Sequence, residues 1–416
     1  MSYRYVIFFS IILASFLILD IYIWKGYKKT VKEKYFRIFK WLIPLSSFVF
    51  LGGFAINIYR GSIGIYNANW FINLFFGISL GFFIAKLVIT VFLFSEDTIR
   101  VLLWIKNKLF FRKDKTKHFA SRRNFVRNIS LGIAAIPVLG SIYAVTKGKY
   151  NFHVKRLDLS MKRLPLSFDG MKVVQFSDFH AGSFDDIEAV REGLSLINEA
   201  NPDLILFTGD LVNNRADEVL LFIDSLKDLS AKHGKFAILG NHDYGDYIKF
   251  ESNLERQKNL DKLESLFKQA GFRLLKNENI QIDNGIDKID IIGVENWGQG
   301  PFPKYGDIDL ASQSTPNERF NILMSHDPDH WENIVRQHPK HFDLTLSGHT
   351  HGSQVGVDIP GWQWSPVQYR YKRWLGMYED NNQYLFVSKG FGFLGFPGRI
   401  GMSPEIISFK LHADEV

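Results

Sequence analysis

Long apolar runs occupy the first third of the chain and constrain its fold more than any other feature. They lie near residues 4–24, 39–59 and 70–95, and each approaches the roughly 20 residues that a helix needs to cross a bilayer. A fourth, weaker run near residues 129–146 contains glycines and a proline, which transmembrane helices tolerate better than soluble helices do. The runs predict an all-α transmembrane region of about four helices over residues 1–149.

The charges of the connecting loops predict how these helices are oriented. Residues 25–40 are crowded with Lys and Arg, whereas the second connection, around Arg60, is nearly uncharged. A third connection, residues 112–127, is basic again. Because basic loops stay in the cytoplasm, four spans would carry residues 150–416 outward. We therefore predict a multi-pass cell-membrane protein with its C-terminal domain on the outer, exoplasmic side.

Two segments beside the apolar runs have alternative interpretations. Ser121–Arg127, with the sequence Ser-Arg-Arg-Asn-Phe-Val-Arg, resembles a twin-arginine export signal, or it is a basic flank that obeys the positive-inside rule. Both interpretations give the same topology. Ile99–Phe111, an apolar stretch interrupted by Lys and Arg, is predicted to lie in the membrane interface rather than to form a further span.

The net charge of +7 and the isoelectric point near 9.2 raise the question of a nucleic-acid partner. Much of the excess Lys and Arg lies in the two basic connections between apolar runs, and this position indicates membrane topology. We therefore expect membrane lipids as partners and no nucleic acid. The chain has no cysteine, so thiolate metal sites and cysteine nucleophiles are excluded.

The pattern changes after about residue 165, where short β-rich apolar runs alternate with amphipathic stretches. Such alternation is typical of a layered α/β domain, which we place at residues 150–416. The predicted strands are 172–177, 204–208, 236–239, 289–294, 321–325 and 342–347. The predicted helices lie near 185–200, 216–229 and 257–270.

Polar clusters end five of the predicted strands. They are Asp178-Phe179-His180, Gly209-Asp210, Gly240-Asn241-His242-Asp243, His326-Asp327 and Gly348-His349-Thr350-His351. Since ligands bind at the carboxyl ends of strands in open α/β sheets, we expect the clusters to converge. Residues two apart on an extended segment face the same side, so Asp178 and His180, or His349 and His351, are predicted to share one site. The neighbouring glycines permit turns in which a bulky residue would clash.

The polar residues of these clusters form a set of metal ligands. Imidazoles, carboxylates and one amide oxygen suit Mn, Fe, Zn, Co or Mg. The candidates are Asp178, His180, Asp210, Asn241, His326, His349 and His351. This set exceeds what one ion needs, and two ions bridged by a carboxylate stabilise both the attacking and the departing oxygen in phosphoryl displacement.

The order Asp-x-His, Gly-Asp, Gly-Asn-His-Asp, His and Gly-His-x-His resembles the calcineurin-like metallophosphoesterases over roughly residues 170–411. The closest resemblance is to the membrane-attached bacterial branch, in which Ser-Gly-His-Thr-His-Gly-Gly-Gln is frequent; here Ser353 replaces the last Gly. The resemblance implies a four-layer α/β/β/α sandwich and a membrane-anchored, dinuclear metal-dependent phosphoesterase. The choice between a phosphodiester and a phosphomonoester stays open.

The resemblance also implies a role for each residue of the clusters. One metal would be bound by Asp178, His180 and His351, the other by Asn241, His326 and His349, with Asp210 bridging both. His242 would lie near the leaving-group oxygen as a proton donor, and Asp243 could orient it. The implied reaction is attack on phosphorus by a metal-bound hydroxide.

Residues 362–374, which mix aromatics with bases, have two interpretations. They are ordinary core and loop packing, or they form a pocket wall or a membrane-facing lip, since Trp and Tyr favour the headgroup level and Arg or Lys attract phosphate. The second interpretation favours a phospholipid or another lipid-linked phosphate ester as the substrate.

Two other functions compete with the phosphoesterase. One is a non-catalytic, metal-binding membrane scaffold, which the presence of His242 argues against. The other is an accessory domain of a transporter, which charges inside the spans would support; Asp20 and Lys86 are the clear candidates.

The remaining polar residues have simpler predicted roles. Asp327 and Asp329 either support the metal ligands from behind or cap a helix before Trp331, and we favour the cap. Surface or structural roles are expected for His153, His233, His330, His338, His341 and His412.

Overall fold

The computed structural model describes residues 3–28, 33–62, 68–110, 120–300 and 304–414. The chain divides into a helical unit, Met1–Ile65 with Phe71–Thr146, and an α/β unit, Tyr66–Trp70 with Lys147–Val416. Each unit has its own buried core, so each is described by itself.

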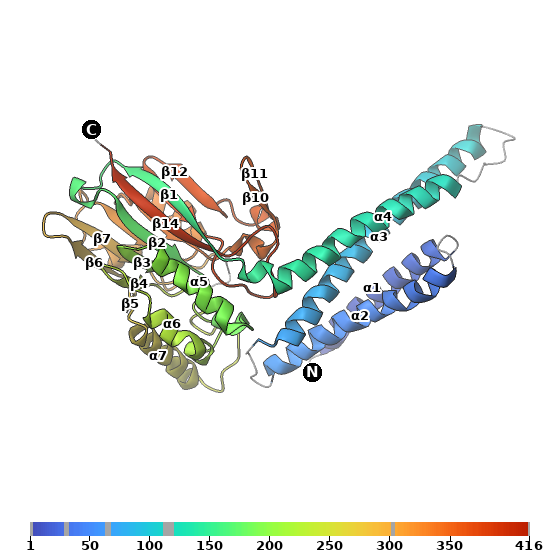
Figure 1. Cartoon of the computed structure of the whole chain (residues 1–416), viewed down its shortest axis with the longest axis horizontal. Coiled ribbons are helices and arrows are strands. Elements are labelled where there is room, and N and C mark those ends of the chain that lie inside the picture. Colours follow the sequence, from blue (N-terminus) through green and yellow to red (C-terminus); the bar gives the residue numbers. More distant parts are fainter. Residues whose placement is uncertain (1–2, 29–32, 63–67, 111–119, 301–303, 415–416) are drawn as a thin grey trace. The chain divides into compact units, whose positions relative to one another are not determined.

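Four helices form the helical unit (Figure 1): α1 (Tyr3–Tyr27), α2 (Glu33–Ser62), α3 (Trp70–Phe110) and α4 (Ala120–Thr146). Among the described residues, three segments are long and apolar enough to cross a membrane: Tyr35–Gly53, Trp70–Leu109 and Asn124–Tyr150. The helices therefore agree with the predicted membrane region. That the helices make four spans, and how the spans are oriented, remain predictions.

The segment predicted as a separate interfacial helix, Ile99–Phe111, is instead continuous with α3 as far as Phe110. No glycine or proline interrupts the second half of α3, so nothing breaks the ladder of backbone hydrogen bonds there. Arg100 also forms salt bridges with Glu96 and Asp97, one turn earlier on the same helix. Such pairs, three or four residues apart, support a continuous helix.

The two charged residues predicted inside the spans form a buried pair. Lys86 of α3 forms a salt bridge with Asp20 of α1 at 2.7 Å. Ser47 of α2 donates to Asp20 at 2.7 Å, and the Lys86 ammonium donates to the carbonyl of Ile43 at 2.6 Å. The pair thus links three helices. Because the opposite charges neutralise each other, the pairing accounts for both of them inside an apolar bundle.

Two six-stranded sheets form the centre of the α/β unit. The first sheet has the order β1 (His153–Met161), β14 (Glu405–Ala413), β2 (Met171–Phe176), β3 (Leu204–Phe207), β4 (Lys235–Ala237) and β5 (Arg273–Leu274). The second has the order β12 (Gly376–Asp380), β13 (Gln383–Val387), β9 (Leu344–Ser347), β8 (Asn321–Met324), β7 (Lys288–Gly293) and β6 (Glu278–Asp283).

Each sheet contains a run of parallel strands. They are β2 to β5 in the first sheet, and β7, β8, β9 and β13 in the second. Antiparallel pairs lie at both edges of the second sheet, whereas in the first sheet β14 pairs antiparallel with β2 and parallel with the edge strand β1. The carboxyl ends of the parallel strands carry all five polar clusters.

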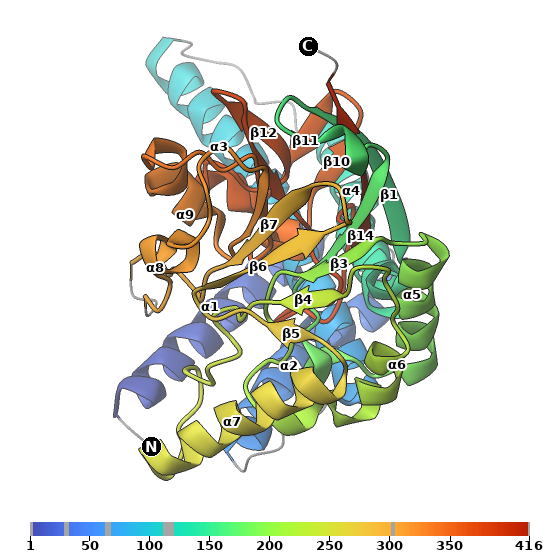
Figure 2. The same cartoon turned by 90° about the vertical axis from the view of Figure 1, so that its left-hand side faces the viewer.

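Helices cover the outer face of each sheet. Figure 2 shows α5 (Ile187–Glu199), α6 (Ile223–Lys227) and α7 (Asn253–Gln269) on one side of the strands, and α8 (Ile308–Ser312) and α9 (Pro328–Asn333) on the other. Helix α5 illustrates how the sequence produces this arrangement. The Asp186 side chain caps its first turn, and its buried side chains Val190, Leu194 and Ile197 recur at helical spacing on one face.

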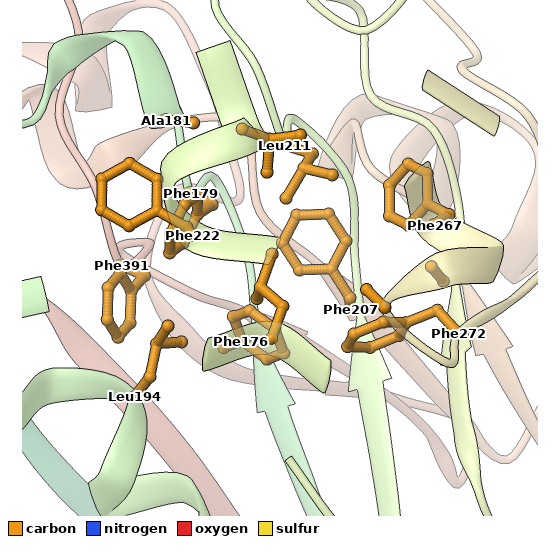
Figure 3. Close-up of a cluster of buried hydrophobic side chains, with 14 of the residues drawn as sticks. Phe176, Phe179, Ala181, Leu194, Phe207, Leu211, Phe222, Phe267, Phe272 and Phe391 are labelled. Atoms are coloured by element: carbon orange, nitrogen blue, oxygen red, sulfur yellow. The ribbon is translucent and has the colours of Figure 1, made fainter. Parts of the chain in front are cut away.

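Three buried clusters hold the layers together. In the first, phenylalanines such as Phe176, Phe207 and Phe272 fill the space between the first sheet and its helices (Figure 3). The second joins the inner faces of the two sheets, with Leu206 from one and Ile322 from the other. The third joins the second sheet to α8 and α9. These clusters confirm the predicted four-layer α/β/β/α sandwich.

Candidate metal centre

Loops that follow β2, β3, β4, β8 and β9 bring the predicted ligands together. The expectation of one open sheet was incomplete, because the loops come from both sheets of the sandwich. All seven residues are buried or nearly so. The first sheet contributes Asp178, His180, Asp210 and Asn241, and the second contributes His326, His349 and His351.

Asp178, His180 and His351 form one group that could hold a metal ion. The Nε2 atoms of the two histidines lie 3.0 Å apart. The same nitrogen of His351 lies 3.3 Å from Asp178 Oδ1. Two imidazole nitrogens and a carboxylate oxygen therefore converge on one point.

Asp210, His326 and His349 form the second such group. His326 Nε2 lies 3.2 Å from Asp210 Oδ2 and 3.3 Å from His349 Nδ1. Asn241 joins the group, because its Oδ1 atom lies 2.8 Å from His349 Nδ1. The second point of convergence thus has two nitrogens and two oxygens.

A single oxygen of Asp210 lies between the two groups. Its Oδ2 atom is 3.6 Å from His180 Nε2 in the first group and 3.2 Å from His326 Nε2 in the second. The other oxygen, Oδ1, accepts the backbone N–H of His242 at 2.8 Å, which fixes the carboxylate plane. Asp210 therefore occupies the position that a bridging carboxylate would need.

The backbone at four of the candidate ligands differs from the prediction. Asp178 and His180 were expected on an extended segment, but their φ angles are 53° and 49°, in the left-handed region. His349 and His351 were expected on another, but their φ angles are 72° and 52°, and the two side chains belong to different groups. Asp210 is also left-handed, with φ of 60°. Residues other than glycine rarely adopt this backbone conformation, and those that do are concentrated at functional sites. The predicted convergence was right, but the backbone geometry given for it was wrong.

Two glycines allow the carboxylates to pack directly on the backbone. A Cβ atom on Gly240 would overlap the Asp210 carboxylate. A Cβ atom on Gly348 would overlap both Ser177 and the Asp178 carboxylate. These glycines are therefore required by close approach, in addition to the turns that the sequence predicted.

Burial and neighbouring charges set the protonation of the first group. Burial lowers the pKa of His180 to about 3, and it lowers that of His351 well below the usual range. Both imidazoles are therefore neutral, as metal ligands must be. Burial raises the pKa of Asp178 to about 6, against the lowering effect of His326. A buried carboxylate of this kind needs a nearby positive charge to stay ionised.

The second group contains a strong ion pair. Burial acts to lower the pKa of His326, but Asp210 raises it to about 10. Burial would raise the pKa of Asp210, yet His326 and His242 hold it well below its usual range. His349 is neutral, since burial lowers its pKa to about 3. Positive charge beside Asp210 is thus favourable. A divalent cation held by the same donor set would supply that charge in place of the His326 proton, which a metal-binding imidazole must lose.

His242 lies at the edge of both groups. Its Nδ1 atom lies 2.8 Å from the carbonyl oxygen of Asn213, so Nδ1–H donates and Nε2 is the nitrogen left for other chemistry. Its ring stacks on Tyr247, with 4.3 Å between the centroids. This position suits a proton donor and differs from that of the ligand nitrogens.

Asp243 does not orient His242 as the sequence suggested. Its buried carboxylate accepts backbone N–H groups from the loops after β3 and β4 instead. The donors are Asp210 at 2.9 Å, Leu211 at 2.8 Å, Val212 at 3.2 Å and Gly240 at 2.9 Å. The orienting group for His242 is the Asn213 carbonyl.

Comparison with known proteins identifies the family. The calcineurin-like phosphoesterase family matches residues 171–353, and a probable calcineurin-like phosphoesterase transmembrane domain matches residues 3–149. The uncharacterized metallophosphoesterase YkuE of Bacillus subtilis is 30% identical over 298 residues, which cover 70% of this chain and 97% of YkuE. The chain belongs to the calcineurin-like phosphoesterase family.

Other relatives of this phosphoesterase also carry membrane segments or cover its whole length. An uncharacterized metallophosphoesterase of Campylobacter jejuni is 24% identical over 413 residues, covering 98% of each chain. A transmembrane protein with a metallophosphoesterase domain from Danio rerio is 25% identical over 286 residues, covering 67% of this chain and 60% of that protein. The family and the two residue groups support a metal-dependent phosphoesterase in a membrane protein.

Two tyrosines of the phosphoesterase contact candidate ligands. The Tyr371 hydroxyl lies 2.8 Å from His349 Nε2. The Tyr247 hydroxyl accepts from Asn241 Nδ2 at 2.6 Å, which turns Oδ1 of that amide toward the second group. Tyr371 lies in the aromatic and basic segment noted in the sequence, although its role was not predicted. No motif pointed to Tyr247.

Arg399 is a third residue that the sequence analysis missed. It is buried, and its guanidinium donates to the carbonyls of Lys389 at 2.7 Å, Gly392 at 2.8 Å and Met402 at 2.9 Å. Its Nη2 atom lies 3.3 Å from His351 Nδ1. An isolated arginine far along the chain gives no sequence signal, because only the fold shows what it binds.

Two residues that were predicted to be structural lie on α9 or at its start. Asp327 caps α9 by accepting the N–H of Asp329 at 2.9 Å, as predicted, and its carboxylate also lies 3.9 Å from His349 Nε2. His330 is buried, with Nδ1 2.8 Å from the Ser325 hydroxyl and its ring stacked on Trp297. Its role is therefore structural.

Proposed function

We propose that the protein is a membrane-anchored phosphohydrolase with two divalent metal ions. The first ion would be held by Asp178, His180 and His351, and the second by Asn241, His326 and His349, with Asp210 shared between them. Residues 1–149 would form the anchor, and residues 150–416 the catalytic domain.

The position of Asp210 is the observation that carries this proposal. One oxygen lies within 3.6 Å of a histidine nitrogen from each group. A single-ion site would leave one group of buried imidazoles and carboxylate without a cation. A shared carboxylate instead serves two ions, which is the arrangement that suits displacement at phosphorus.

The bound ions and His242 would have different roles in the reaction. When bound, the ions would activate water and offset the negative charge of the phosphoryl oxygens; Mn, Fe, Zn, Co and Mg all suit the donor set. His242, held by the Asn213 carbonyl, would direct Nε2 toward the leaving-group oxygen and donate a proton to it. The buried ligands exclude bulk water from the reacting atoms.

The membrane region supports the proposed location and substrate class. A family transmembrane domain matches residues 3–149, and basic loops favour a catalytic domain on the outer side. We propose a phosphate ester substrate that is itself a phospholipid or is linked to a lipid, because an anchored enzyme meets such esters at its own membrane.

Hydrolysis by the full-length protein in detergent tests the proposal. The substrates are bis-p-nitrophenyl phosphate and p-nitrophenyl phosphate, with and without added Mn²⁺, and bound metal is measured by mass spectrometry. The variants are Asp210→Asn, which removes the shared carboxylate charge, and His242→Ala, which leaves the ligands intact. His412→Ala is the matched control, since this histidine pairs with Asp158 far from both groups.

The proposal requires three results together. Wild type and His412→Ala should bind about two ions and need metal for hydrolysis. Asp210→Asn should lose both metal and activity. His242→Ala should keep its metal, but its hydrolysis rate should fall by a factor of about 10² to 10⁴, as expected for loss of a general acid. The proposal of an enzyme would be refuted if metal-loaded wild type hydrolysed neither ester nor a lipid phosphate in vesicles. The ratio of the two rates indicates diester or monoester preference.

A further inference from the structure

A small two-stranded hairpin stands apart from the two sheets. It consists of β10 (Val357–Ile359) and β11 (Trp362–Trp364), which are antiparallel. Val357 pairs with Trp364, and Ile359 pairs with Trp362. Because successive side chains of a strand point to opposite faces, these four apolar side chains share one face of the hairpin.

The other face of the hairpin is polar and is bound to the body of the α/β unit. Asp358 and Gln363 pair across the strands, and the amide of Gln363 donates to Asp358 at 2.9 Å. Asp358 also accepts from the buried ammonium of Lys389 at 2.8 Å. Asp358 therefore ties this face to the protein through an ion pair, although the neighbouring Gln363 is exposed.

Three of the four side chains on the apolar face are exposed. Ile359 is 53% exposed, Trp362 58% and Trp364 38%, whereas Val357 is half-buried. A surface hairpin ordinarily buries its apolar face and exposes its polar one. The reversed arrangement leaves a contiguous patch of two indoles and an aliphatic side chain outside, and such patches mark surfaces that bind a partner or a membrane.

The base of the hairpin is fixed beside the candidate metal centre. Ser365 donates to the carbonyl of Gly352 at 2.7 Å, and Gly352 directly follows His351. The N–H of Gly356 donates to the carbonyl of Ile400 at 3.0 Å. The hairpin thus leaves the protein next to a proposed ligand, and whatever its apolar face contacts is held near the reacting groups.

The chemistry of the patch fits the headgroup region of a bilayer. Indole rings combine an apolar body with one N–H donor, which is why tryptophan concentrates at membrane–water interfaces. The paired apolar face carries no charged side chain. Residues 147–152 alone connect α4 to β1, and so short a connection spans at most about 20 Å. The start of β1 is therefore kept near any bilayer that α4 crosses. His153 at that start pairs with Glu405, which lies 3.4 Å from the ammonium of Lys389. The same ammonium binds Asp358 of the hairpin.

We propose that the apolar face of the β10–β11 hairpin inserts into the headgroup region of the membrane. The contact rests on the proposed function, because it would hold the metal centre where a lipid-linked phosphate ester lies. Nearby basic side chains already have acidic partners: Arg370 pairs with Asp329 at 3.6 Å, and Lys372 with Glu332 at 3.2 Å. The contact is therefore driven by apolar burial and depends little on anionic lipid.

Site-specific labelling of the full-length protein tests the contact. Because the chain has no cysteine, Trp362→Cys or Ile359→Cys introduces a unique site for an environment-sensitive fluorophore. The labelled protein is reconstituted into phosphatidylcholine vesicles with and without lipids that carry a quencher near the headgroup. Ile286→Cys is the control, since Ile286 is an exposed apolar side chain, 81% exposed, in the turn between β6 and β7.

The expected result is strong quenching at positions 359 and 362 and little at 286. Replacing a fifth of the phosphatidylcholine by phosphatidylglycerol should change the quenching little. Equal quenching at all three positions would overturn the proposal. So would efficient disulfide formation between Trp362→Cys copies without lipid quenching, because the face would then contact a second copy of the chain.

Hydrolysis by the double variant Trp362→Ser, Trp364→Ser separates this proposal from the proposed function. The rate on bis-p-nitrophenyl phosphate should stay at the wild-type value, while the rate on a vesicle-borne lipid phosphate should fall at least about tenfold, since the loss of even one of the two buried aromatic anchors would have this effect. Unchanged rates on both substrates would refute the membrane contact and leave the phosphoesterase standing. Inactivity of the wild type on both would refute the enzyme instead.

Discussion

Removal of the Tyr371 hydroxyl should weaken metal binding at one group only. His349 directs Nδ1 toward Asn241 and His326, and its Nε2 atom lies 2.8 Å from the Tyr371 oxygen. Burial raises the pKa of Tyr371 above its usual range, so the side chain stays a neutral phenol. For Nδ1 to bind a metal, Nε2 must carry the proton, and Tyr371 is the acceptor that stabilises this tautomer.

The size of the effect follows from the hydrogen bond that is lost. In Tyr371→Phe, the N–H of a nearly buried imidazole loses its acceptor, which costs about 1 to 3 kcal/mol. Such partners of metal-bound histidine typically contribute a factor of about 10 to 100 in metal affinity. These two ranges agree, since 1.4 kcal/mol corresponds to about tenfold.

Metal titration of the full-length protein measures this effect. Hydrolysis and bound metal are followed against free Mn²⁺ for wild type, Tyr371→Phe and Tyr369→Phe, a control whose side chain is 81% exposed. We expect Tyr371→Phe to need about 10 to 100 times more Mn²⁺ for the second equivalent, with a nearly normal rate at saturation. A wild-type titration curve would refute the tautomer argument, and an equal loss of both equivalents would point to general unfolding.

Three further variants test other parts of the structure. Gly348→Ala should cost the first metal equivalent, because its methyl group would overlap the Asp178 carboxylate; full metal content would contradict this. Lys86→Met should destabilise the helical unit by about 3 to 5 kcal/mol, since Asp20 is left buried and unpaired, and adding Asp20→Leu should restore much of the melting temperature in detergent. Burial raises the pKa of Glu218 to about 7, so the native state binds the proton more tightly than the unfolded state. The contribution of Glu218 to the free energy of unfolding is therefore present below pH 4.5 and is lost as the pH rises to 7. Between these pH values the melting temperature of Glu218→Gln should fall less than that of the wild type.

The residues of the candidate centre could be predicted because their clusters directly follow buried apolar strands. The six strands expected between residues 172 and 347 all occur, with boundaries within two residues. Burial on both faces makes such strands continuous apolar runs, which sequence reveals well. The edge strands β1, β6 and β12 were missed, since they mix exposed and buried residues and give no such run.

The geometry of the centre could not be predicted in the same way. Left-handed φ angles at Asp178, His180 and Asp210 depend on contacts from distant segments, such as the packing of Gly240 against the Asp210 carboxylate. The tyrosines and Arg399 are brought to the ligands only by tertiary folding. Sequence therefore predicts which groups converge, and the fold decides how each one is oriented.

Asp243 shows why orientation matters more here than proximity. Its carboxylate accepts the backbone N–H of Asp210, the proposed shared ligand, and the backbone N–H of Gly240. Asp210 Oδ1 in turn accepts the backbone N–H of His242. Burial and the negative charge of Asp210 together raise the pKa of Asp243 to about 7. Burying the charged carboxylate is unfavourable, but without it four backbone N–H groups would lack an acceptor in the interior. A left-handed Asp210 between two groups of histidines is thus held by the carboxylate of Asp243, which accepts its backbone N–H. The shared ligand and the proposed proton donor are thereby positioned by the same loop.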